Sequence, residues 1–394
     1  MKAWLFLFKT HTIMASMNDR PQAPATWVDQ QSGLDEILSS LSASHQIAVD
    51  TESNSLYAYQ EQVCLIQLSS QGQDYLIDGL AKLDLTAIGE LFSNPVIEKI
   101  FHAAEYDILC LKRDFGFSFI NLFDTMQAAR ILGYEKLGLA NMLEDLLGIA
   151  QVKCFQKADW GKRPLSAGML DYARMDTQYL AQLRDLLESQ LRQKGLFELA
   201  REDFERLCRV ESNHKNTALY AQVSGYQHLD GQGLRILEEL CQYRDQQARK
   251  LNRPHFKVIG NAALLAVAQA RPVRLAELNA IKELSPKLVE RHGKGLLDAA
   301  RQGTGKMPIQ HKNHKRPAQA FLDRLESLKE WRKKAAAAMR VQSDIILPRD
   351  ILEEIAGKNP LDDQALQDVM NEVPWRFSHF GQEILAQIKQ ENHP

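Results

Sequence analysis

Two carboxylates stand two residues apart at the end of an apolar segment that reads IAVDTES. Side chains at positions i and i+2 leave a β-strand on the same face, so Asp50 and Glu52 point the same way on a strand. Like charges side by side repel each other unless a cation lies between them. Mg²⁺ and Mn²⁺ take oxygen ligands of this kind. The pair therefore indicates a divalent-metal site, and a strand that simply runs out into solvent is the alternative.

Two more acidic groups occur at suitable places in the chain. The segment FHAAEYD reads as a strand end followed by the first turn of a helix, which carries Glu105 and Asp107. The segment DYARMD lies in a helical pattern, where Tyr172 and Asp176 are four residues apart and share a face. A phenol beside a carboxylate suits a water molecule held for attack next to a metal ion. Four acids and a tyrosine at these positions favour a metal-dependent hydrolase.

The elements that must position these residues alternate between strand and helix patterns. The expected strands are Ile47–Asp50, Val63–Ser69, Asp74–Asp78 and Glu98–His102. The expected helices are Leu83–Phe92, Ala104–Phe115, Asp124–Leu132, Leu139–Leu147 and Ser166–Lys194, several of them ended by a glycine. Asp124 and Thr125 are expected to cap the helix that they begin. This order predicts an α/β sheet domain over residues 26–210.

The remainder of the chain shows no convincing strand. Two helical blocks are expected at 217–303 and 318–391, each about the size of a small bundle. Between them, residues 304–317 contain glycine, proline, four basic residues and two histidines, which is the composition of a basic linker. Residues 1–25 are expected to be a disordered extension or the product of an incorrect start site, because the short apolar run is not followed by a cleavage site.

Composition excludes several classes of protein. The chain has 394 residues, 45% of them hydrophobic and 25% charged, and no apolar run long enough to cross a bilayer. Its five cysteines form no CxxC pair, which argues against a zinc knuckle and predicts a reducing, cytoplasmic location. Charge is unevenly divided: residues 1–210 carry a net −8 and residues 211–394 a net +6. This division suggests carboxylates that bind metal in one half and a cationic surface in the other.

A resemblance to the ribonuclease D group of DEDD 3′–5′ exonucleases rests on five ordered motifs: VDTES, FHAAEYDILCLKRDFG, FDTMQAARILG, ADWGKRPL and YARMDTQYL. The spacing of Tyr172 and Asp176 matches the tyrosine-bearing subclass. The similarity covers Thr26–Phe204, and Phe101–Tyr179 is especially similar to the exosome-associated branch. Both helical blocks resemble HRDC domains, the first more clearly than the second. Ser53 departs from the phenylalanine of many bacterial relatives, which leaves open how the terminal base is stacked.

This resemblance implies a ribonuclease-H-like fold, a mixed sheet flanked by helices. It further implies that two Mg²⁺ or Mn²⁺ ions, about 3.5–4 Å apart, are bound across the scissile phosphate. One ion would activate the attacking water and the other would stabilise the leaving 3′ oxygen. Tyr172 would orient the water. The implied metal ligands are Asp50, Glu52, Asp107 and Asp176.

Several other residues are weaker candidates. Glu105 and Asp159 lack a partner at ligand spacing. His102 is a candidate nucleic-acid contact and Trp160 a candidate neighbour of the substrate, with structural packing as the alternative for both. The basic residues Lys157, Lys162 and Arg163 are candidate phosphate contacts. In the first helical block, basic residues surround His255 and Phe256, which suits a nucleic-acid surface, with a solvated loop as the alternative. These basic residues are Arg249, Lys250, Arg253 and Lys257.

Three functions compete. The favoured one is a divalent-metal-dependent 3′–5′ exoribonuclease that releases nucleoside 5′-monophosphates and matures the 3′ ends of tRNA and other structured RNAs, acting as a monomer without an obligate protein partner. The second is the same chemistry on DNA. The third is a catalytically silent RNA-binding scaffold, and the intact acidic quartet argues against it.

Overall fold

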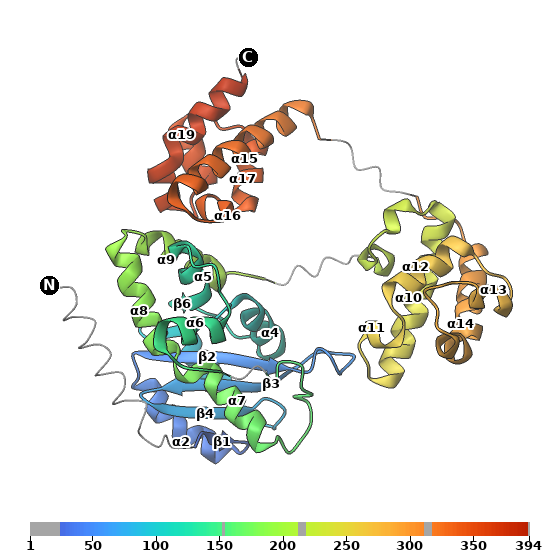
Figure 1. The fold of residues 1–394 in the computed structure, drawn as a ribbon, viewed down its shortest axis with the longest axis horizontal. Coiled ribbons are helices and arrows are strands. Elements are labelled where there is room, and N and C mark those ends of the chain that lie inside the picture. Colours follow the sequence, from blue (N-terminus) through green and yellow to red (C-terminus); the bar gives the residue numbers. More distant parts are fainter. Residues whose placement is uncertain (1–23, 152–153, 212–217, 311–316, 393–394) are drawn as a thin grey trace.

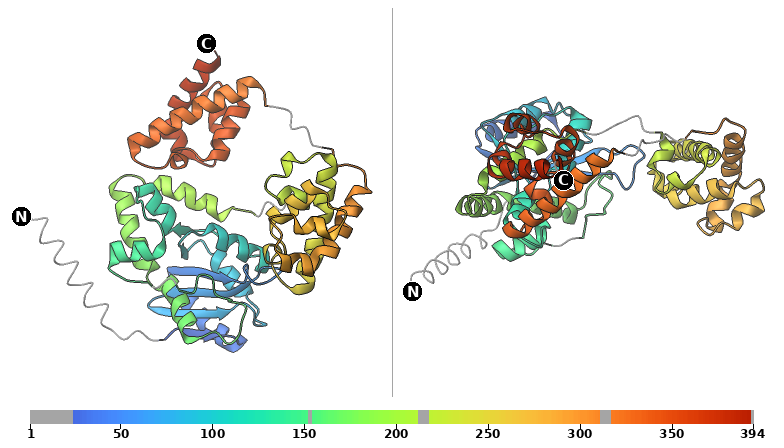
Figure 2. Two further views of the ribbon diagram at one scale, coloured as in Figure 1. Left: turned by 45° about the vertical axis from the view of Figure 1, so that its right-hand side comes forward. Right: turned by 90° about the horizontal axis from the view of Figure 1, so that it is seen from above.

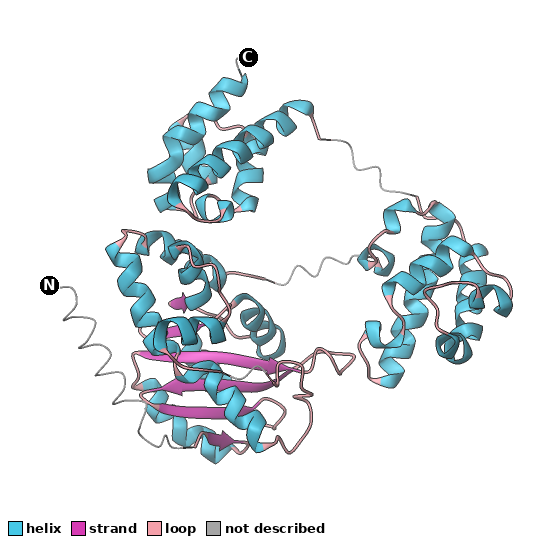
Figure 3. Ribbon diagram, viewed as in Figure 1, coloured by secondary structure: helices cyan, strands magenta, loops and turns pink. Residues whose placement is uncertain are grey.

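The computed structural model describes residues 24–151, 154–211, 218–310 and 317–392. All but the last two residues of the expected N-terminal extension lie outside these ranges. The centre of the basic linker, 311–316, does so as well. Within the described residues, every strand belongs to the N-terminal domain, and the rest of the chain is helical (Figure 3).

The N-terminal domain is built on one mixed sheet of six strands in the order β1-β4-β3-β2-β5-β6. Strands β2, β3 and β4 form an antiparallel meander, while β1, β5 and β6 run parallel to their neighbours. The strand bounds are β1 Thr26–Val28, β2 Gln46–Ser53, β3 Val63–Ser70, β4 Gln73–Asp78, β5 Glu98–Phe101 and β6 Leu122–Asp124. Every residue of β3 is buried, because β3 lies in the middle of the sheet and is covered on both faces.

Helices cover this sheet. Helix α7 crosses β2, β3 and β4, whereas α8 packs on β2 and β5, and α4 packs against β3 (Figure 1). The helix bounds are α2 Gln31–Ser42, α3 Thr86–Ser93, α4 Glu105–Phe115, α5 Thr125–Leu132, α6 Leu139–Leu147, α7 Ala167–Gln178, α8 Leu180–Gln193 and α9 Phe197–Cys208. Gly116, Gly133 and Gly148 end α4, α5 and α6 in the left-handed conformation that glycine adopts without strain.

The sequence prediction differs from the structure in two ways. It missed β1, α2, β6 and α9, and the two strands among these have only three residues each and too little pattern to detect. It also joined α7 and α8 into one helix over Ser166–Lys194. The structure interrupts that helix at Tyr179, whose φ of −108° and ψ of 3° leave the helical region. Because of this break, α7 lies over β3 and β4 while α8 lies over β5.

Two separate helical domains follow, each with its own apolar core (Figure 2). The first contains the short 3₁₀ helices η1 Leu219–Gln222 and η2 Tyr226–His228, then α10 Gly231–Leu251, α11 His255–Val258, α12 Asn261–Ala270, α13 Leu275–Asn279 and α14 Pro286–Thr304. The second contains α15 Gln319–Met339, α16 Ser343–Ile346, α17 Arg349–Lys358, α18 Asp363–Val369 and α19 Pro374–Asn392. Among the described residues, no helix is both long enough and apolar enough to cross a membrane.

Candidate active site

The site begins at the end of β2. Asp50 and Glu52 leave this strand on the face that α7 covers, and a register shift after Glu52 interrupts the pairing with β3. Asp176 reaches the same place from α7. Asp50, Glu52 and Asp176 each offer an oxygen, and these oxygens lie within 4.8 Å of one another. Three carboxylates from two elements that are distant in sequence therefore converge on one point.

Asp107 approaches the same strand end from α4. The Thr51 hydroxyl donates to Asp107 Oδ1 over 2.5 Å, so the residue between the two strand carboxylates holds the fourth acid. The turn before α4 is unusual because Ala103 has a φ of +68°. Asp124 stabilises that turn, because its carboxylate accepts a hydrogen bond from the Ala104 amide at 2.7 Å. A backbone in this strained region persists only where its surroundings hold it.

The same Asp124 side chain also caps the next helix. It accepts from the Gln127 amide at 2.9 Å, which confirms the predicted N-cap of α5. Thr125 instead donates to the Phe101 carbonyl at 3.0 Å, so it ties α5 to the end of β5. One buried carboxylate therefore fixes both the turn that presents Asp107 and the helix that follows.

Tyr172 and Asp176 lie one turn apart on α7, which begins at the Ser166 N-cap. The Tyr172 hydroxyl donates to the Asp176 carboxylate, and the Gln151 amide donates to Asp176 Oδ1 at 2.5 Å. The Tyr172 ring packs near the Trp160 ring, with centroids 6.2 Å apart. Burial and the neighbouring carboxylates raise the pKa of Tyr172, so the phenol keeps its proton and acts as a donor.

The carboxylates disfavour one another's ionisation. Burial, followed by the charges of Asp107, Asp176 and Glu52, raises the pKa of Asp50 well above its usual range. Burial, followed by the charges of Asp176 and Asp107, raises the pKa of Glu52 to about 9. Burial also raises the pKa of Asp107 and of Asp176. A divalent cation would offset this repulsion, and an all-oxygen donor set is the kind that Mg²⁺ and Mn²⁺ prefer. The residues present therefore fit such an ion.

Comparisons with known proteins agree with this geometry. Residues 25–192 match the family described as 3′-5′ exonuclease, and residues 233–299 and 321–388 each match the HRDC domain. Residues 25–192 therefore belong to the 3′–5′ exonuclease family, and two HRDC domains follow them, which is the arrangement predicted from the resemblance to ribonuclease D. Together with the mixed six-stranded sheet flanked by helices, these matches confirm the ribonuclease-H-like fold that was predicted from the sequence.

Individual relatives give the extent of the similarity. The chain is 30% identical to Protein RRP6-like 1 of Arabidopsis thaliana over 82% of this chain and 51% of that protein. It is 40% identical to Exosome complex exonuclease RRP6 of Saccharomyces cerevisiae over 42% of this chain and 23% of that protein. The chain thus spans about half, or less, of the length of these curated relatives.

Solved structures extend the comparison of the fold. The catalytic core of RRP6 from Trypanosoma brucei matches with a TM-score of 0.62 and 28% identity, over 72% of this chain and 80% of that one. Escherichia coli RNase D matches with a TM-score of 0.68 and 21% identity, over 93% of this chain and 99% of that one. The second similarity shows a shared fold that includes the helical domains.

The exonuclease domain places the weaker candidates around the carboxylates without adding a ligand. Glu105 is exposed on α4, and Asp159 lies 3.8 Å from the Lys162 ammonium. His102 is 2.9 Å from the Thr125 hydroxyl through Nδ1, and burial lowers its pKa. Trp160 is almost fully buried. Trp160 therefore packs in the interior, whereas His102 is half-buried beside Thr125, and its contact with nucleic acid stays a prediction.

Arg163 forms hydrogen bonds with several parts of the exonuclease domain. Its guanidinium binds both oxygens of Asp78, at 2.5 and 2.8 Å, and donates to the carbonyls of Cys64 and Trp160. It also lies over the Trp27 ring. Because its donors are used by the protein, we assign Arg163 a structural role in place of the expected phosphate contact. Lys157 and Lys162 remain exposed.

The basic segment of the first HRDC domain lies against the connection between β2 and β3, the segment that directly follows Glu52 (Figure 1). The Tyr59 hydroxyl donates to Asp245 Oδ1 at 2.7 Å, and Arg249 lies over the Tyr59 ring. Lys257 Nζ is 4.0 Å from the centre of the Tyr57 ring. These contacts bring the expected RNA-binding residues next to the loop that leaves the site.

Lys250 and Arg253 are exposed on the same segment of the HRDC domain. The Tyr57 hydroxyl donates to the Lys157 carbonyl at 2.6 Å, so Lys157 belongs to this neighbourhood as well. Five of the expected nucleic-acid contacts therefore present exposed charge near the β2–β3 connection: Lys157, Arg249, Lys250, Arg253 and Lys257.

Two residues that contact the site carboxylates were not predicted from the sequence. Thr51 stands inside the DxE motif, and its alternation with Asp50 and Glu52 already places it on the opposite face, towards α4. Gln151 reaches Asp176 from a loop 25 residues earlier, and no local pattern predicts such a contact.

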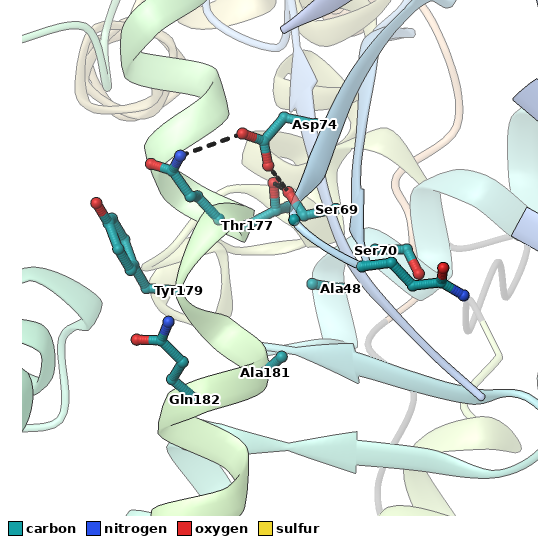
Figure 4. A pocket seen from close by; sticks show the side chains of 11 residues that line it. Ala48, Ser69, Ser70, Asp74, Thr177, Tyr179, Ala181 and Gln182 are labelled. Atoms are coloured by element: carbon teal, nitrogen blue, oxygen red, sulfur yellow. Dashed lines mark hydrogen bonds between the residues drawn. The ribbon is translucent and has the colours of Figure 1, made fainter. Parts of the chain in front are cut away.

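A separate pocket of about 320 Å³ lies where β3 ends and β4 begins, beside the end of α7 (Figure 4). It is lined by Ser69, Asp74 and Thr177 among others, and it includes Ala48 but none of the four metal-ligand candidates. The Ser69 hydroxyl donates to Asp74 and lies 2.7 Å from the Thr177 hydroxyl. This pocket is distinct from the carboxylate site.

Proposed function

We propose that this protein is a divalent-metal-dependent 3′–5′ exoribonuclease that releases nucleoside 5′-monophosphates. The observation that carries the proposal is the convergence of Asp50, Glu52 and Asp176 within 4.8 Å, with the Tyr172 hydroxyl on Asp176. Anionic oxygens of this kind hold the metal ions in hydrolases that cut phosphodiesters, and Tyr172 adds a neutral donor beside them.

Each residue has a distinct role in this proposal. Asp50, Glu52, Asp107 and Asp176 would hold two Mg²⁺ or Mn²⁺ ions. These ions supply an activated water and stabilise the charge that develops on the leaving oxygen. Tyr172 keeps its proton, because burial and neighbouring charge raise its pKa, and it therefore orients the attacking water and does not act as a base. Thr51 and Gln151 hold Asp107 and Asp176 in place.

The proposed substrates are the 3′ ends of structured RNAs, including tRNA precursors. Support comes from the exposed cations Lys250, Arg253 and Lys257, which lie beside the loop that follows Glu52 and can bind phosphates of the RNA body. A reducing, cytoplasmic location belongs to the same proposal and is consistent with five free cysteines. Names such as Exosome complex component 10 place several relatives in a complex, so the expectation of a monomer without a protein partner gains no support from them.

The test is a digestion of RNA and DNA oligonucleotides of one sequence, labelled at the 5′ end, with Mg²⁺ and with EDTA. We expect RNA to shorten stepwise from its 3′ end, with nucleoside 5′-monophosphates identified by mass spectrometry, and no reaction in EDTA or with Asp50→Asn. Faster shortening of DNA would favour the DNA exonuclease. Absence of product from both substrates would favour the silent scaffold.

A further inference from the structure

Gln67 is a buried amide without a partner. It lies in the middle of β3 with none of its surface exposed, and neither its Nε2 nor its Oε1 has a hydrogen-bond partner. Buried side-chain amides are nearly always paired, since an unmet donor or acceptor lowers stability. An unpaired buried amide in the middle of a sheet lowers the stability of the fold. We therefore expect a neighbouring group to accept a hydrogen bond from Gln67, or to donate one to it, once the site binds its metal ions.

The register of the sheet places Gln67 directly opposite Asp50. Strands β2 and β3 are antiparallel, and Asp50 pairs with Gln67. Residues that face each other in this way point to the same side of the sheet, with Cβ atoms about 4.5–5.5 Å apart. Helix α7 covers that side, as the contact between Ser69 of β3 and Thr177 shows. The amide of Gln67 is therefore on the face of the Asp50 carboxylate and within reach of it.

The other neighbours of Gln67 on this face of the sheet itself offer no hydrogen bond to it. Leu76 pairs with it from β4, and Leu65 stands two residues away on β3. Both leucines belong to an apolar cluster with Ala173 of α7. The Ser69 hydroxyl is already engaged with Asp74 and Thr177. The polar group directly across from the amide is the Asp50 carboxylate.

We propose that Gln67 is a positioning residue for Asp50: its Nε2 donates to the Asp50 carboxylate when the site holds its divalent ions. This inference rests on the proposed function, because Asp50 must be a metal ligand. An ionised carboxylate accepts several hydrogen bonds, so it can receive one from the amide while another lone pair faces the cation. Hydrogen bonds of this kind fix the orientation of a ligand, and their removal typically weakens metal binding by about 10–100-fold.

The test measures metal affinity and metal-free stability in the same variants. Mn²⁺ is titrated calorimetrically into full-length wild-type protein and Gln67→Leu, and the melting temperature is recorded in EDTA. We expect Gln67→Leu to bind Mn²⁺ about 10–100-fold more weakly. We also expect it to melt in EDTA at the wild-type temperature or higher, because an unpaired buried amide has been removed. A structural role alone would lower the melting temperature and leave the affinity unchanged.

Ser69→Ala is the matched control. It removes a buried polar group from the same face of β3, two residues from Gln67, so it should lower the melting temperature without changing the Mn²⁺ affinity. Gln67→Met tests the same idea with a flexible side chain if the leucine variant does not fold. Wild-type affinity in Gln67→Leu or Gln67→Met would overturn the inference alone, whereas a wild-type protein that binds no Mn²⁺ would overturn the proposed metal site itself.

Discussion

Arg376 of the second HRDC domain is fully buried against Glu202 of the exonuclease domain, with 2.8 Å between Nη1 and Oε2. Its Nη2 lies 2.8 Å from Asp203, and two of its nitrogens donate to the Ile345 carbonyl. The backbone amide of Trp375 also donates to Glu202. A buried cation with two acids and a carbonyl around it fixes the position of this helical domain on α9.

The first prediction follows from this contact. Arg376→Met should lower the free energy of unfolding by about 3–5 kcal/mol, because it leaves two buried carboxylates without a cation. Urea unfolding of the full-length protein measures the change. Arg209→Gln is the control: Arg209 meets Glu372 across the same interface but is half exposed, so its loss should cost no more than about 1 kcal/mol. An equal decrease in the free energy of unfolding for the two variants would show that the buried Arg376 contacts stabilise the protein no more than the exposed Arg209 pair does.

The second prediction concerns pH. Burial and mutual repulsion hold the pKa of Asp50 and of Glu52 above their unfolded values, which lie near about 4. The folded metal-free protein therefore keeps protons that the unfolded chain releases, so its stability falls as pH rises from about 4 towards about 9. Bound Mn²⁺ takes the place of these protons. The increase in melting temperature on adding Mn²⁺ should consequently be larger at about pH 8 than at about pH 5. Scanning fluorimetry at both values checks this, and an equal increase would contradict it.

The third prediction is that Asp50→Asn and Asp176→Asn abolish hydrolysis and yet melt at a higher temperature than the wild type in EDTA at about pH 8. Loss of a ligand removes transition-state stabilisation worth several kcal/mol. The same loss relieves repulsion among buried carboxylates. Glu105→Gln, an exposed acid in the first turn of α4, should change neither property. Near-normal turnover of purified Asp50→Asn would refute the assignment of Asp50 as a ligand.

The fourth prediction separates Tyr172 from the ligands. Tyr172→Phe removes one hydroxyl and no charge, so kcat should fall by about 10²–10⁴-fold, while the affinities for Mn²⁺ and RNA stay close to those of the wild type. Asp176 keeps its Gln151 partner in this variant. Steady-state kinetics and calorimetry distinguish the outcomes. A loss of Mn²⁺ affinity as large as that of Asp176→Asn would place Tyr172 among the groups that hold the metal.

The sequence predicts most of the central sheet because its strands are apolar runs between clear turns. It also brings Asp50 and Glu52 to one face, since that follows from strand alternation alone. What it cannot predict depends on pairs that meet only after folding. In the sequence, Gln67 is simply a glutamine within an apolar strand, and only the register of the folded sheet places it opposite Asp50. The sequence suggests that Arg163 is available to bind phosphate, and only the folded structure shows that Asp78 accepts hydrogen bonds from its guanidinium.

The end of the exonuclease domain near residue 210 is another place where the sequence alone does not reveal contacts that form on folding. Every expected ligand precedes Val210, so the sequence predicts that a fragment ending there keeps all the chemistry. The structure adds that such a fragment would lose Arg376 from Glu202 and Asp203, together with the apolar contact of Ile345 with the core of the exonuclease domain. We therefore expect the fragment to be less stable than the full chain, which is why the last prediction uses the full-length protein.

That last prediction tests the basic face of the first HRDC domain. The variant with Lys250→Gln, Arg253→Gln and Lys257→Gln should bind RNA more weakly and with a shallower salt dependence. For single strands, log K changes with log salt by about 0.7 for each phosphate neutralised, so three contacts correspond to a change in slope of about 2. The Asp50→Asn background prevents hydrolysis while Kd is measured by fluorescence anisotropy across a potassium chloride series.

The matched control removes equal charge from the second HRDC domain, through Lys329→Gln, Lys333→Gln and Lys334→Gln on the exposed side of α15. The control should keep the wild-type slope, because the contacts of the β2–β3 connection with a helical domain go to the first HRDC domain among the described residues. The difference between the two triple variants should be larger for a folded RNA with a 3′ tail than for a short oligonucleotide. We expect this because a folded RNA offers many more phosphates beyond its 3′ end to these cations than a short strand does. Equal slopes for both variants on the folded RNA would mean that the segment around Lys257 serves only to dock its domain on the β2–β3 connection.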